Sequence, residues 1–440
     1  MSILSNLEGV TYGVVGLGKT GHATLKALRQ AGARVVVFDD QCSLSDADFM
    51  HPDQMPWDQM TALVLSPGIP HDLPSPHPAA TLAKHHKVPI ITDIELFFQT
   101  RPKAKIVGIT GTNGKSTTTA LIAHVLREAG IPAVMGGNIG TPILSLEPLS
   151  EGGVYVLELS SYQLERAPSL SLDVAIFLNL SPDHLDRHGS MEGYCAAKER
   201  LFSNPKPGQI RIVGVDDPWS QQVYARQSHH GPQATLAISA EEVPVCLQDV
   251  ARQNGALRGS HNAQNMVASY QALRALGLSD GVIARHMASF PGLPHRLEQV
   301  ATCAGVQFIN DSKATNGDAA ARALQLFQSV FWIVGGRPKE GGLRDALPHL
   351  KDVQKAYLIG EAQQPFAAEL GDRLPCALCG DLAAAVKAAF ADAKASGHDA
   401  PVVLLAPACT SWDQYQSFEH RGDHFKAVVA EICAIERGAA

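Results

Sequence analysis

Short apolar runs, rich in β-branched residues, alternate with stretches of helical periodicity along most of the chain. Near the N-terminus these runs predict strands at 12–16, 34–39, 62–65 and 88–92, with a helix at 21–31 after the first strand. Strands that are apolar on both sides and alternate with helices are typical of parallel sheets covered on both faces. The pattern therefore predicts an α/β fold.

The same alternation continues through the rest of the chain, with two interruptions. A proline-rich stretch at 67–78 precedes the first, and Pro291-Gly292-Leu293-Pro294 forms the second. Clusters of proline and glycine often separate domains. We therefore expect three α/β domains, at 1–94, 95–292 and 293–440. The remaining strands are predicted at 106–110, 154–159, 174–180, 306–309, 330–334, 356–359 and 402–405, and further helices at 117–128 and 381–395.

Size and charge narrow the classes of function. The chain has 440 residues, 45% of them hydrophobic, and a single core stops growing near about 300 residues. The formal net charge is -7, so no basic surface indicates that the protein binds nucleic acid. An anionic substrate must therefore be held by local lysines, arginines and helix N-termini.

The eight cysteines are thinly scattered, and only Cys376 and Cys379 form a CxxC pair. Without a second pair or a nearby histidine, this pattern favours structural cysteines over a zinc site and fits a reducing compartment. The first ten residues lack the basic stretch and the long apolar run of a signal peptide. No window approaches about 18 consecutive apolar residues, so we expect a cytoplasmic protein without a membrane span.

A glycine-rich turn, Gly111-Thr112-Asn113-Gly114-Lys115-Ser116-Thr117, joins the strand at 106–110 to the following helix. Glycines let backbone N–H groups point at phosphate oxygens, and the helix N-terminus adds partial positive charge. Lys115 can reach the β- and γ-phosphates, and the Ser116 hydroxyl can bind Mg²⁺. The general motif requires a glycine where this chain has Ile109. The turn predicts a phosphate-binding loop, and the alternative is a glycine turn with an incidental lysine.

A second glycine turn, Gly16-Leu17-Gly18-Lys19-Thr20-Gly21, lies between the first predicted strand and its helix. It matches GxGxxG, and Asp39 and Asp40 follow about 20 residues later, as in the dinucleotide fingerprint. Read alone, this pattern indicates an NAD-binding domain. The same turn serves any nucleotide diphosphate, because its chemistry is a pyrophosphate on a helix N-terminus. A tight turn without a ligand also remains open.

Polar residues lie at the ends of the central strands. Glu158 is late in an apolar strand, where an acid requires a partner such as a metal or a cation. His184, Asp183 and Asp186 follow the next strand and are candidates for metal ligands or for helix capping. Lys198 lies in a helical stretch, and its position alone predicts an ordinary solvated lysine.

Further polar clusters precede helices or follow strands. Asn262 could cap the helix that begins near His261, and Asn265 could hydrogen-bond a base edge. The remaining clusters are His295-Arg296-Leu297-Glu298, Asp311-Ser312-Lys313-Ala314-Thr315-Asn316 and the glycine-rich loop at 335–342. Each can be a turn with a cap, but their location at strand carboxyl ends favours a binding site there.

These residues together resemble the Mur ligase family. The shared motifs, which follow one another along residues 10–425, are 111–117, Glu158-Leu159-Ser160-Ser161, Asp183-His184-Leu185-Asp186, His261-Asn262, His295-Arg296 and 311–316. The family's loop lacks the same glycine, so Ile109 fits the resemblance. Further motifs resemble the members that add D-glutamate to UDP-N-acetylmuramoyl-L-alanine, namely 16–21, Ser66-Pro67-Gly68, Pro294-His295-Arg296 and Pro407-Ala408-Cys409-Thr410-Ser411. The Asp-Asn-Pro-Arg motif of the diaminopimelate-adding relatives is not present in the sequence.

The resemblance implies a Rossmann-like N-terminal domain for the UDP substrate, a central P-loop NTPase-like parallel sheet for ATP and two Mg²⁺ ions, and a Rossmann-like C-terminal domain for D-glutamate. It implies ATP contacts at Gly111, Thr112, Asn113, Gly114, Lys115, Ser116, Thr117, Asn265, Arg296 and Asp311. It implies metal ligands at Ser116, Glu158, His184 and a carbamylated Lys198, and catalytic roles for Lys115, His184 and Lys198. It implies UDP-substrate contacts at Gly18, Lys19, Thr20, Asp39, Asp40, Gly68 and Asn138, and D-glutamate contacts at Thr315, Lys339, Ser411 and Phe418.

The resemblance implies a ligase that forms an acyl phosphate and then an amide in peptidoglycan precursor synthesis. The expected partners are its two substrates, with a monomeric enzyme and neither nucleic acid nor membrane as a partner. Three alternatives remain. An oxidoreductase would use the 16–21 turn but leaves the phosphate loop unexplained, and a non-catalytic ATP-binding switch would need no D-glutamate selectivity. Folylpolyglutamate synthetase also joins glutamate to a carboxylate, but it lacks the N-terminal nucleotide domain.

Overall fold

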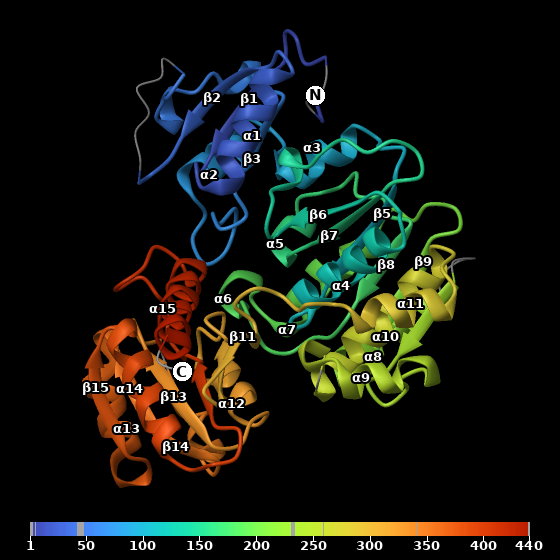
Figure 1. The fold of residues 1–440 in the computed structure, drawn as a ribbon. Coiled ribbons are helices and arrows are strands. Elements are labelled where there is room, and N and C mark those ends of the chain that lie inside the picture. The colour runs from blue at the N-terminus through green and yellow to red at the C-terminus, as the bar shows by residue number, and fades with distance from the viewer. Residues whose placement is uncertain are drawn as a thin grey trace. The chain divides into compact units, whose positions relative to one another are not determined.

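The computed structural model describes residues 3–4, 6–41, 48–229, 234–257, 259–339 and 341–438. The chain divides into two compact units, Met1–Phe290 and Pro291–Ala440. The first unit contains two sheets and the second contains one, and helices cover the faces of each (Figure 1). The α/β fold with three sheet-based domains, predicted from the alternation of strands and helices, is confirmed.

The N-terminal sheet has four parallel strands in the order β2-β1-β3-β4. Its strands are Thr11–Val15 (β1), Arg34–Phe38 (β2), Ala62–Leu65 (β3) and Ile90–Ile91 (β4), and its helices are Lys19–Gln30 (α1), Pro78–His85 (α2) and Asp93–Gln99 (α3). Val14, Val36 and Leu63 are almost fully buried, because both faces of the sheet are covered. Since β2 and β3 flank β1 on opposite sides, a switch point lies at the carboxyl end of β1, where such sheets bind ligands.

The central sheet has six parallel strands in the order β10-β9-β8-β5-β7-β6. Its strands are Lys105–Thr110 (β5), Ala133–Gly137 (β6), Val154–Glu158 (β7), Val174–Phe177 (β8), Ile210–Gly214 (β9) and Ala234–Ile238 (β10). Its helices are Lys115–Glu128 (α4), Ser161–Leu164 (α5), Leu185–His188 (α6), Met191–Glu199 (α7), Pro218–Ser228 (α8), Gln248–Gln253 (α9), Ser260–Ala275 (α10) and Asp280–Ala288 (α11). The loop after β5 therefore lies between the ends of β7 and β8.

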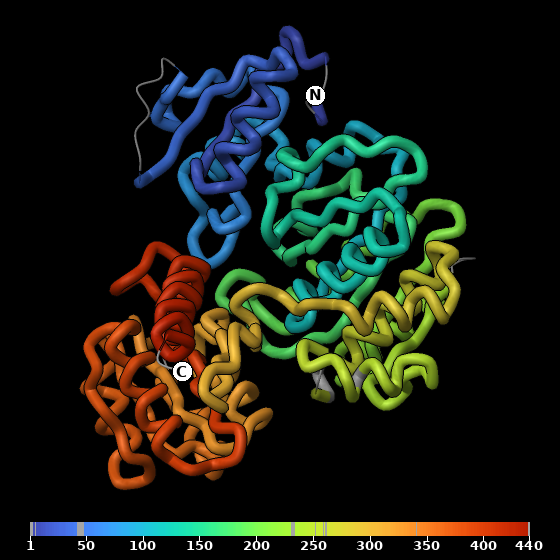
Figure 2. Tube along the Cα trace, in the orientation of Figure 1, coloured from blue at the N-terminus to red at the C-terminus, as the bar shows by residue number. Residues whose placement is uncertain are grey.

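The sheet of the second unit has six strands in the order β11-β12-β16-β13-β14-β15. They are Glu298–Cys303 (β11), Val306–Asn310 (β12), Val330–Gly335 (β13), Val353–Ile359 (β14), Cys376–Gly380 (β15) and Val402–Leu405 (β16). The helices are Gly317–Leu324 (α12), Gln363–Leu370 (α13), Leu382–Ala395 (α14) and Phe418–Gly438 (α15). The chain trace shows α15 as a long, continuous helix that ends the described chain (Figure 2). Trp332, on the central strand β13, is fully buried.

One edge of this sheet is antiparallel, because β11, a strand that the sequence did not predict, pairs antiparallel with β12. Only Ala304 and Gly305 separate the two strands, and both have positive φ, at +47° and +81°. A two-residue turn of this kind joins antiparallel neighbours, whereas a parallel pair requires a long crossover.

The strands that sequence reasoning missed lie near sheet edges or carry atypical residues. β6 ends in two glycines, β9 contains a buried arginine, Arg211, and β15 has no fully buried residue. The pattern of apolar runs is weak in such strands, since one or both faces need not be apolar. Cys376 and Cys379 both lie in β15, and both are free thiols.

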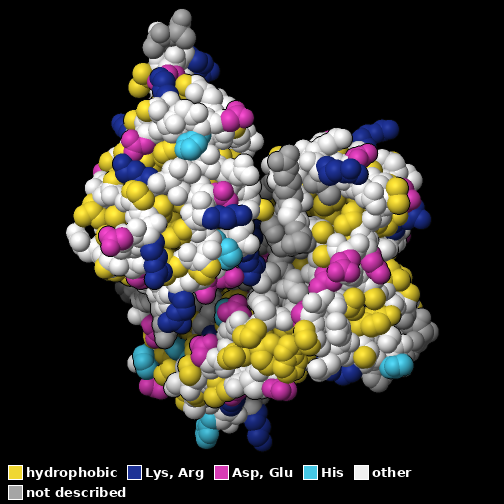
Figure 3. All heavy atoms as spheres, turned by 90° about the horizontal axis from the view of Figure 1, so that it is seen from below, with side chains coloured by type: hydrophobic (Ala, Val, Ile, Leu, Met, Phe, Trp, Pro, Cys, Tyr) yellow, Lys and Arg dark blue, Asp and Glu magenta, His cyan; other side chains and the backbone are white. Residues whose placement is uncertain are grey.

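The surface carries charges of both signs. On the face seen in Figure 3, lysines and arginines are interspersed with aspartates and glutamates rather than gathered in one basic patch. Within the described ranges, no helix combines the length and the apolar character that crossing a membrane requires.

The glycine turn after β1 generates a test of the fold. A Cβ on Gly21 would lie 1.8 Å from Gly16 O, whereas a Cβ on Gly18 would meet nothing within 4 Å. We expect Gly21→Ala to lower the free energy of unfolding by about 1–3 kcal/mol or more, because helix and strand must separate. Gly18→Ala is the matched control and should change it by less than about 1 kcal/mol. Thermal denaturation measures both, and equal melting temperatures would contradict the close-packing argument.

Candidate active site

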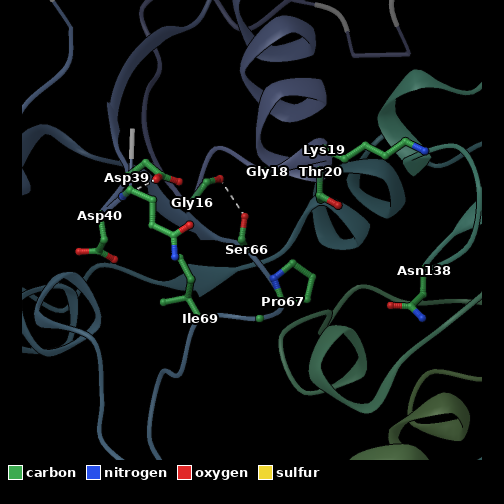
Figure 4. A pocket seen from close by; sticks show the side chains of 12 residues that line it. Gly16, Gly18, Lys19, Thr20, Asp39, Asp40, Ser66, Pro67, Ile69 and Asn138 are labelled. Carbon is green, nitrogen blue, oxygen red and sulfur yellow. Dashed lines mark hydrogen bonds between the residues drawn. The ribbon is translucent and has the colours of Figure 1, made fainter. Parts of the chain in front are cut away.

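A pocket of about 440 Å³ lies at the carboxyl ends of β1, β2 and β3 (Figure 4). Most of its lining comes from loops of the N-terminal sheet, but Asn138 follows β6 of the central sheet and stands on the opposite side from Asp39 and Asp40. All seven residues expected to contact the UDP substrate line this pocket: Gly18, Lys19, Thr20, Asp39, Asp40, Gly68 and Asn138. The structure thus brings this set together, while their roles stay predictions.

The glycine turn in this pocket is shaped to receive an anion. Gly16 has φ +91°, which L side chains rarely adopt. The N-cap of α1 is Gly18, which has no side chain to satisfy the first N–H groups of this 12-residue helix. Lys19 also lines this pocket, and its side chain extends away from the turn, where its Nζ donates to Gly140 O at 2.5 Å. A phosphate group would meet free N–H donors here.

Asp39 ties the glycine turn to the end of β2. Its Oδ2 accepts the Leu17 N–H at 2.6 Å, and its Oδ1 accepts the Gln41 N–H at 2.8 Å. Asp40 pairs with His77, whose Nε2 lies 3.0 Å from the Asp40 Oδ2. The aspartate of the fingerprint, expected to contact the nucleotide, therefore also shapes the turn that would bind its phosphates.

The phosphate loop wraps the N-terminus of α4, which begins at Lys115, two residues earlier than expected. Gly111 and Gly114 have φ of +150° and +85°. A Cβ on Gly114 would lie 2.1 Å from Asn265 Oδ1. Close packing and the positive φ therefore both require glycine at this position. Asn265 is buried, and its Oδ1 accepts from Thr118 Oγ1 at 3.3 Å. It therefore supports the loop from behind.

Asn179, just after β8, holds the loop in place. Its Oδ1 accepts the Asn113 N–H at 2.9 Å, its Nδ2 donates to Asn113 O at 3.2 Å, and its backbone oxygen accepts the Thr112 N–H at 2.9 Å. The Nδ2 also donates to Gln264 Oε1 at 2.9 Å. Sequence reasoning did not single out Asn179. Its place directly after an apolar strand was the only signal that could have identified it.

Two lysine side chains share one carbonyl oxygen in the phosphate loop. Lys115 Nζ donates to Gly111 O at 3.0 Å and to Thr112 O at 2.8 Å, and Lys198 Nζ donates to Gly111 O at 2.8 Å. Lys198 is only 2% exposed, so the prediction of a solvated lysine is wrong, because α7 turns this face inward. Burial, and then the charge of Lys115, lowers the pKa of Lys198 well below its usual value.

Glu158 ends β7 and is 3% exposed. Its Oε2 accepts from Ser116 Oγ at 2.7 Å and its Oε1 from Asn138 Nδ2 at 2.9 Å. In the structure, two neutral hydrogen-bond donors therefore stand where the sequence led us to expect a metal or a cation beside this buried acid. A carboxylate and a hydroxyl beside a phosphate loop are oxygen ligands of the kind that Mg²⁺ prefers, so the donor set fits the ion.

His184 is the N-cap of α6, with φ +53°. Its side chain makes no capping hydrogen bond, whereas Asp183 Oδ1 accepts the His184 N–H at 3.0 Å. Burial lowers the pKa of His184, which favours the neutral imidazole that a metal ion binds. Among the described residues, no three His, Cys, Asp or Glu side chains are grouped so that they could hold a metal. A cation here would also need hydroxyl, substrate or modified-lysine oxygens.

The capping role expected for Asn262 is wrong. The helix α10 begins at Ser260 and its N-cap is Gly259, so Asn262 lies inside the first turn. Its Oδ1 accepts from Asn265 Nδ2 at 3.1 Å, which orients the residue behind the phosphate loop. The side chain of His261 lies outside the described part of the chain.

In the second unit, candidate residues gather at the carboxyl ends of β12 and β16. Asp311 is buried, and its Oδ1 accepts the Leu297 N–H at 3.1 Å. Burial raises the pKa of Asp311 to about 6, although the charge of Arg296 opposes this shift. Asp311 and Arg296, both expected to contact ATP, therefore influence each other electrostatically.

The four residues expected to hold D-glutamate lie on loops of this unit or at the start of α15. Ser411 is buried, Thr315 and Phe418 are half-buried, and Lys339 is exposed. Lys313 Nζ lies 4.0 Å from the centre of the Phe418 ring, a cation–π distance. Glu340, beside Lys339, lies outside the described residues.

Arg421 of α15, which sequence reasoning did not single out, holds these loops together. It is 1% exposed, and it donates to Ser312 O and Oγ at 2.9 Å each, to Cys409 O at 3.2 Å and to Thr410 O at 3.3 Å. A lone arginine in a helix gives no sequence signal for such a role. Its five donors let one side chain fix the ends of two strands.

Two family models match the chain. Residues 109–273 match the model described as Mur ligase middle domain, and residues 295–409 match the model described as Mur ligase, glutamate ligase domain. The chain is 47% identical to the UDP-N-acetylmuramoylalanine–D-glutamate ligase of Rhodospirillum rubrum, over 98% of this chain and 96% of that one. It is 45% identical to the enzyme of the same name from Nitrobacter winogradskyi, over 98% of each chain.

Solved structures share the fold. The UDP-N-acetylmuramate-alanine ligase MurC of Thermotoga maritima matches with a TM-score of 0.61 at 19% identity, over 96% of this chain and 99% of that one. The MurF ligase of Thermotoga maritima, solved in complex with ADP, matches with a TM-score of 0.58 at 17% identity, over 97% and 96%. At these identities the likeness concerns the fold alone.

The hydrogen bonds of Asn179 generate a test of the phosphate loop. We expect Asn179→Ala to weaken ATP binding about tenfold while the protein stays folded, since two side-chain bonds to Asn113 are lost. Asn254→Ala is the matched control, because Asn254 also donates to backbone carbonyls, those of Met287, Ala288 and Phe290. Calorimetric titration with ATP measures both variants, and equal affinities would contradict the role of Asn179.

Proposed function

Because the chain belongs to the Mur ligase family, we propose that it is an ATP-dependent ligase that joins D-glutamate to UDP-N-acetylmuramoyl-L-alanine. The observation that carries this proposal is the 47% identity to a UDP-N-acetylmuramoylalanine–D-glutamate ligase over 98% of the chain. The product is a peptidoglycan precursor. The proposed enzyme acts as a monomer in the cytoplasm, without nucleic acid or membrane partners.

Each proposed domain has one substrate. Residues 1–94 bind the UDP end of the acceptor in the pocket at the carboxyl ends of β1, β2 and β3, with the pyrophosphate on the N-terminus of α1. Residues 95–292 bind ATP through the phosphate loop. Residues 293–440 bind D-glutamate through Thr315, Lys339, Ser411 and Phe418.

The proposed reaction has two steps that balance in atoms and charge. A carboxylate oxygen of the acceptor attacks the γ-phosphorus of ATP, an acyl phosphate forms, and ADP leaves. The amine of D-glutamate then attacks the acyl carbon, phosphate leaves, and the new amide nitrogen loses a proton. The first step brings several negative charges together, and the Lys115 ammonium opposes their repulsion.

The proposed metal ligands are Ser116, Glu158, His184 and a modified Lys198, for two Mg²⁺ ions. The ions would supply charge neutralisation for the triphosphate and the attacking carboxylate. Support comes from Glu158, whose buried carboxylate accepts hydrogen bonds from two neutral donors, Ser116 and Asn138.

We propose carbamylation for Lys198 because its amine is buried beside a second cation. A depressed pKa provides the neutral amine that attacks CO₂, forming a carbamate and releasing one proton. The change replaces a cation that would repel Mg²⁺ by an anion that binds it. It also removes the repulsion between the two groups that share Gly111 O.

One assay tests the proposed function directly. Phosphate release from ATP should require both UDP-N-acetylmuramoyl-L-alanine and D-glutamate, and L-glutamate should not replace D-glutamate. Release that depends on neither amino acid would show an ATPase and overturn the ligase proposal. Formation of the amide product, measured by mass spectrometry, is the second readout.

Lys115 provides a first variant test. Lys115→Ala should lower kcat at least about 100-fold with the fold intact, because the charge opposing triphosphate repulsion is lost. Lys105→Ala is the matched control, since Lys105 is an exposed lysine at the start of β5, the strand that leads into the phosphate loop. Circular dichroism checks the fold, and wild-type turnover by Lys115→Ala would refute the role of this lysine.

Lys198 provides a second variant test. Lys198→Ala should be nearly inactive, and a short carboxylic acid such as acetate should restore part of the activity by supplying the missing carboxylate. Lys198→Arg should stay inactive with acetate, because the larger side chain fills the space and cannot form a carbamate. Steady-state kinetics measures both, and full activity of Lys198→Ala without acid would exclude the carbamate role.

A further inference from the structure

The loop at 65–69, which follows β3, forms one wall of the N-terminal pocket. Ser66, Pro67, Gly68 and Ile69 all line that pocket (Figure 4). Ser66 Oγ donates to Gly16 O at 2.9 Å, so the loop also contacts the glycine turn. Gly68 has no side chain that could hold the loop in place. The shape of this wall therefore depends on what fixes the loop backbone.

Arg166, which lies between α5 and β8 of the central sheet, fixes the first part of this loop. Its Nη1 donates to Leu65 O at 3.1 Å and its Nη2 to Pro67 O at 3.4 Å, while Nε donates to Tyr162 O at 3.3 Å. The residue is 4% exposed. Burial lowers the pKa of Arg166 to about 10, so the guanidinium stays charged at neutral pH. Charge-assisted bonds of this kind are stronger than neutral ones.

Arg187 of α6 fixes the second part of the same loop. Its Nη1 donates to Gly68 O at 2.9 Å and its Nη2 to Ile69 O at 3.4 Å. Two guanidinium groups of the central sheet therefore bind four carbonyl oxygens between residues 65 and 69. Each arginine spans two of them with separate nitrogens of its planar guanidinium fork.

Both arginines are also tied to the segment that carries His184. Arg187 lies over the Tyr162 ring at 4.4 Å, and the His184 ring packs against the same tyrosine at 5.1 Å. Arg166 binds the backbone of that tyrosine. His188 extends the block, since its Nε2 lies 2.9 Å from Ser161 Oγ and its Nδ1 lies 3.0 Å from Glu165 Oε1. One packed cluster thus touches the pocket wall and His184.

We infer that Arg166 and Arg187 are positioning residues that hold the 65–69 wall of the pocket against the segment bearing His184. They set the distance between the place that receives the UDP end of the acceptor and the place where its carboxylate reacts. This inference rests on the proposed function for the identity of the acceptor, and on the four carbonyl contacts for the geometry. Neither arginine contacts the reacting atoms in this scheme.

Kinetics of two variants tests the inference. Arg166→Met and Arg187→Met should each raise the KM for UDP-N-acetylmuramoyl-L-alanine about tenfold, because two charged hydrogen bonds to the wall are lost. The KM for ATP should stay within about twofold of the wild-type value, since the phosphate loop has other supports. In the double variant, the KM for the acceptor should rise by less than the product of the two single increases, because the two arginines hold the two ends of one loop.

Arg200→Met is the matched control. Arg200 is exposed and donates to Glu165 O at 2.8 Å, next to Arg166, but among the described residues it forms no hydrogen bond with the 65–69 loop. It should leave both KM values unchanged. An equal rise of both KM values in Arg166→Met and Arg187→Met, or no rise for the acceptor, would overturn the positioning role. If Arg166→Met does not fold, the half-buried Arg187 still provides the test.

Titration with UDP alone separates this inference from the proposed function. If the wild-type protein binds UDP but releases no phosphate with D-glutamate, the proposed function is overturned. The positioning role of the two arginines can then still be tested. In that case a UDP dissociation constant raised in both arginine variants, and unchanged in Arg200→Met, supports the inference. A UDP dissociation constant that is unchanged in all three variants overturns it.

Discussion

Two cationic side chains converge on one carbonyl oxygen in the phosphate loop, and the chemistry of the central site depends on how that conflict is resolved. Lys115 and Lys198 both donate to Gly111 O, and Lys198 is almost fully buried. Burial disfavours the charged form of Lys198 and the charge of Lys115 adds to this effect, so a lowered pKa drives the Lys198 amine toward its neutral form. The neutral amine can become a carbamate, and the loop then has one cation for phosphate and one more anion for a metal.

The phosphate loop contains two glycines, Gly111 and Gly114, which have no side chains with which to fix it. Side chains from neighbouring elements hold this loop, and other loops of the candidate sites, by their backbones. Asn179 holds the phosphate loop, Arg166 and Arg187 hold the pocket wall, and Arg421 holds the loops after β12 and β16. The arginines donate to oxygen atoms, so their bonds occupy none of the backbone N–H groups that phosphate binding requires.

The N-terminal glycine turn shows why a motif needs its context. The GxGxxG pattern predicted a nucleotide on the N-terminus of α1, and the turn has the required backbone. The pattern alone favoured NAD, yet membership in the Mur ligase family removes the reason to infer an oxidoreductase. The motif is shared because a pyrophosphate makes the same demands in both cases. The turn therefore leaves the rest of the ligand to other residues of the pocket, to which the central sheet contributes Asn138.

The sequence by itself determined the α/β class, most of the buried strands and the phosphate loop, because apolar runs and glycine turns act locally. The resemblance to a known family, read from sequence motifs, also supplied seven of the residues that line the N-terminal pocket. The sequence did not predict the antiparallel β11, the burial of Lys198, or the roles of Asn179 and the three arginines. Only the tertiary structure decided these, because a hydrogen bond such as that from Arg166 to Leu65 joins residues far apart in the chain, and a solvated lysine and a buried one have the same local sequence pattern.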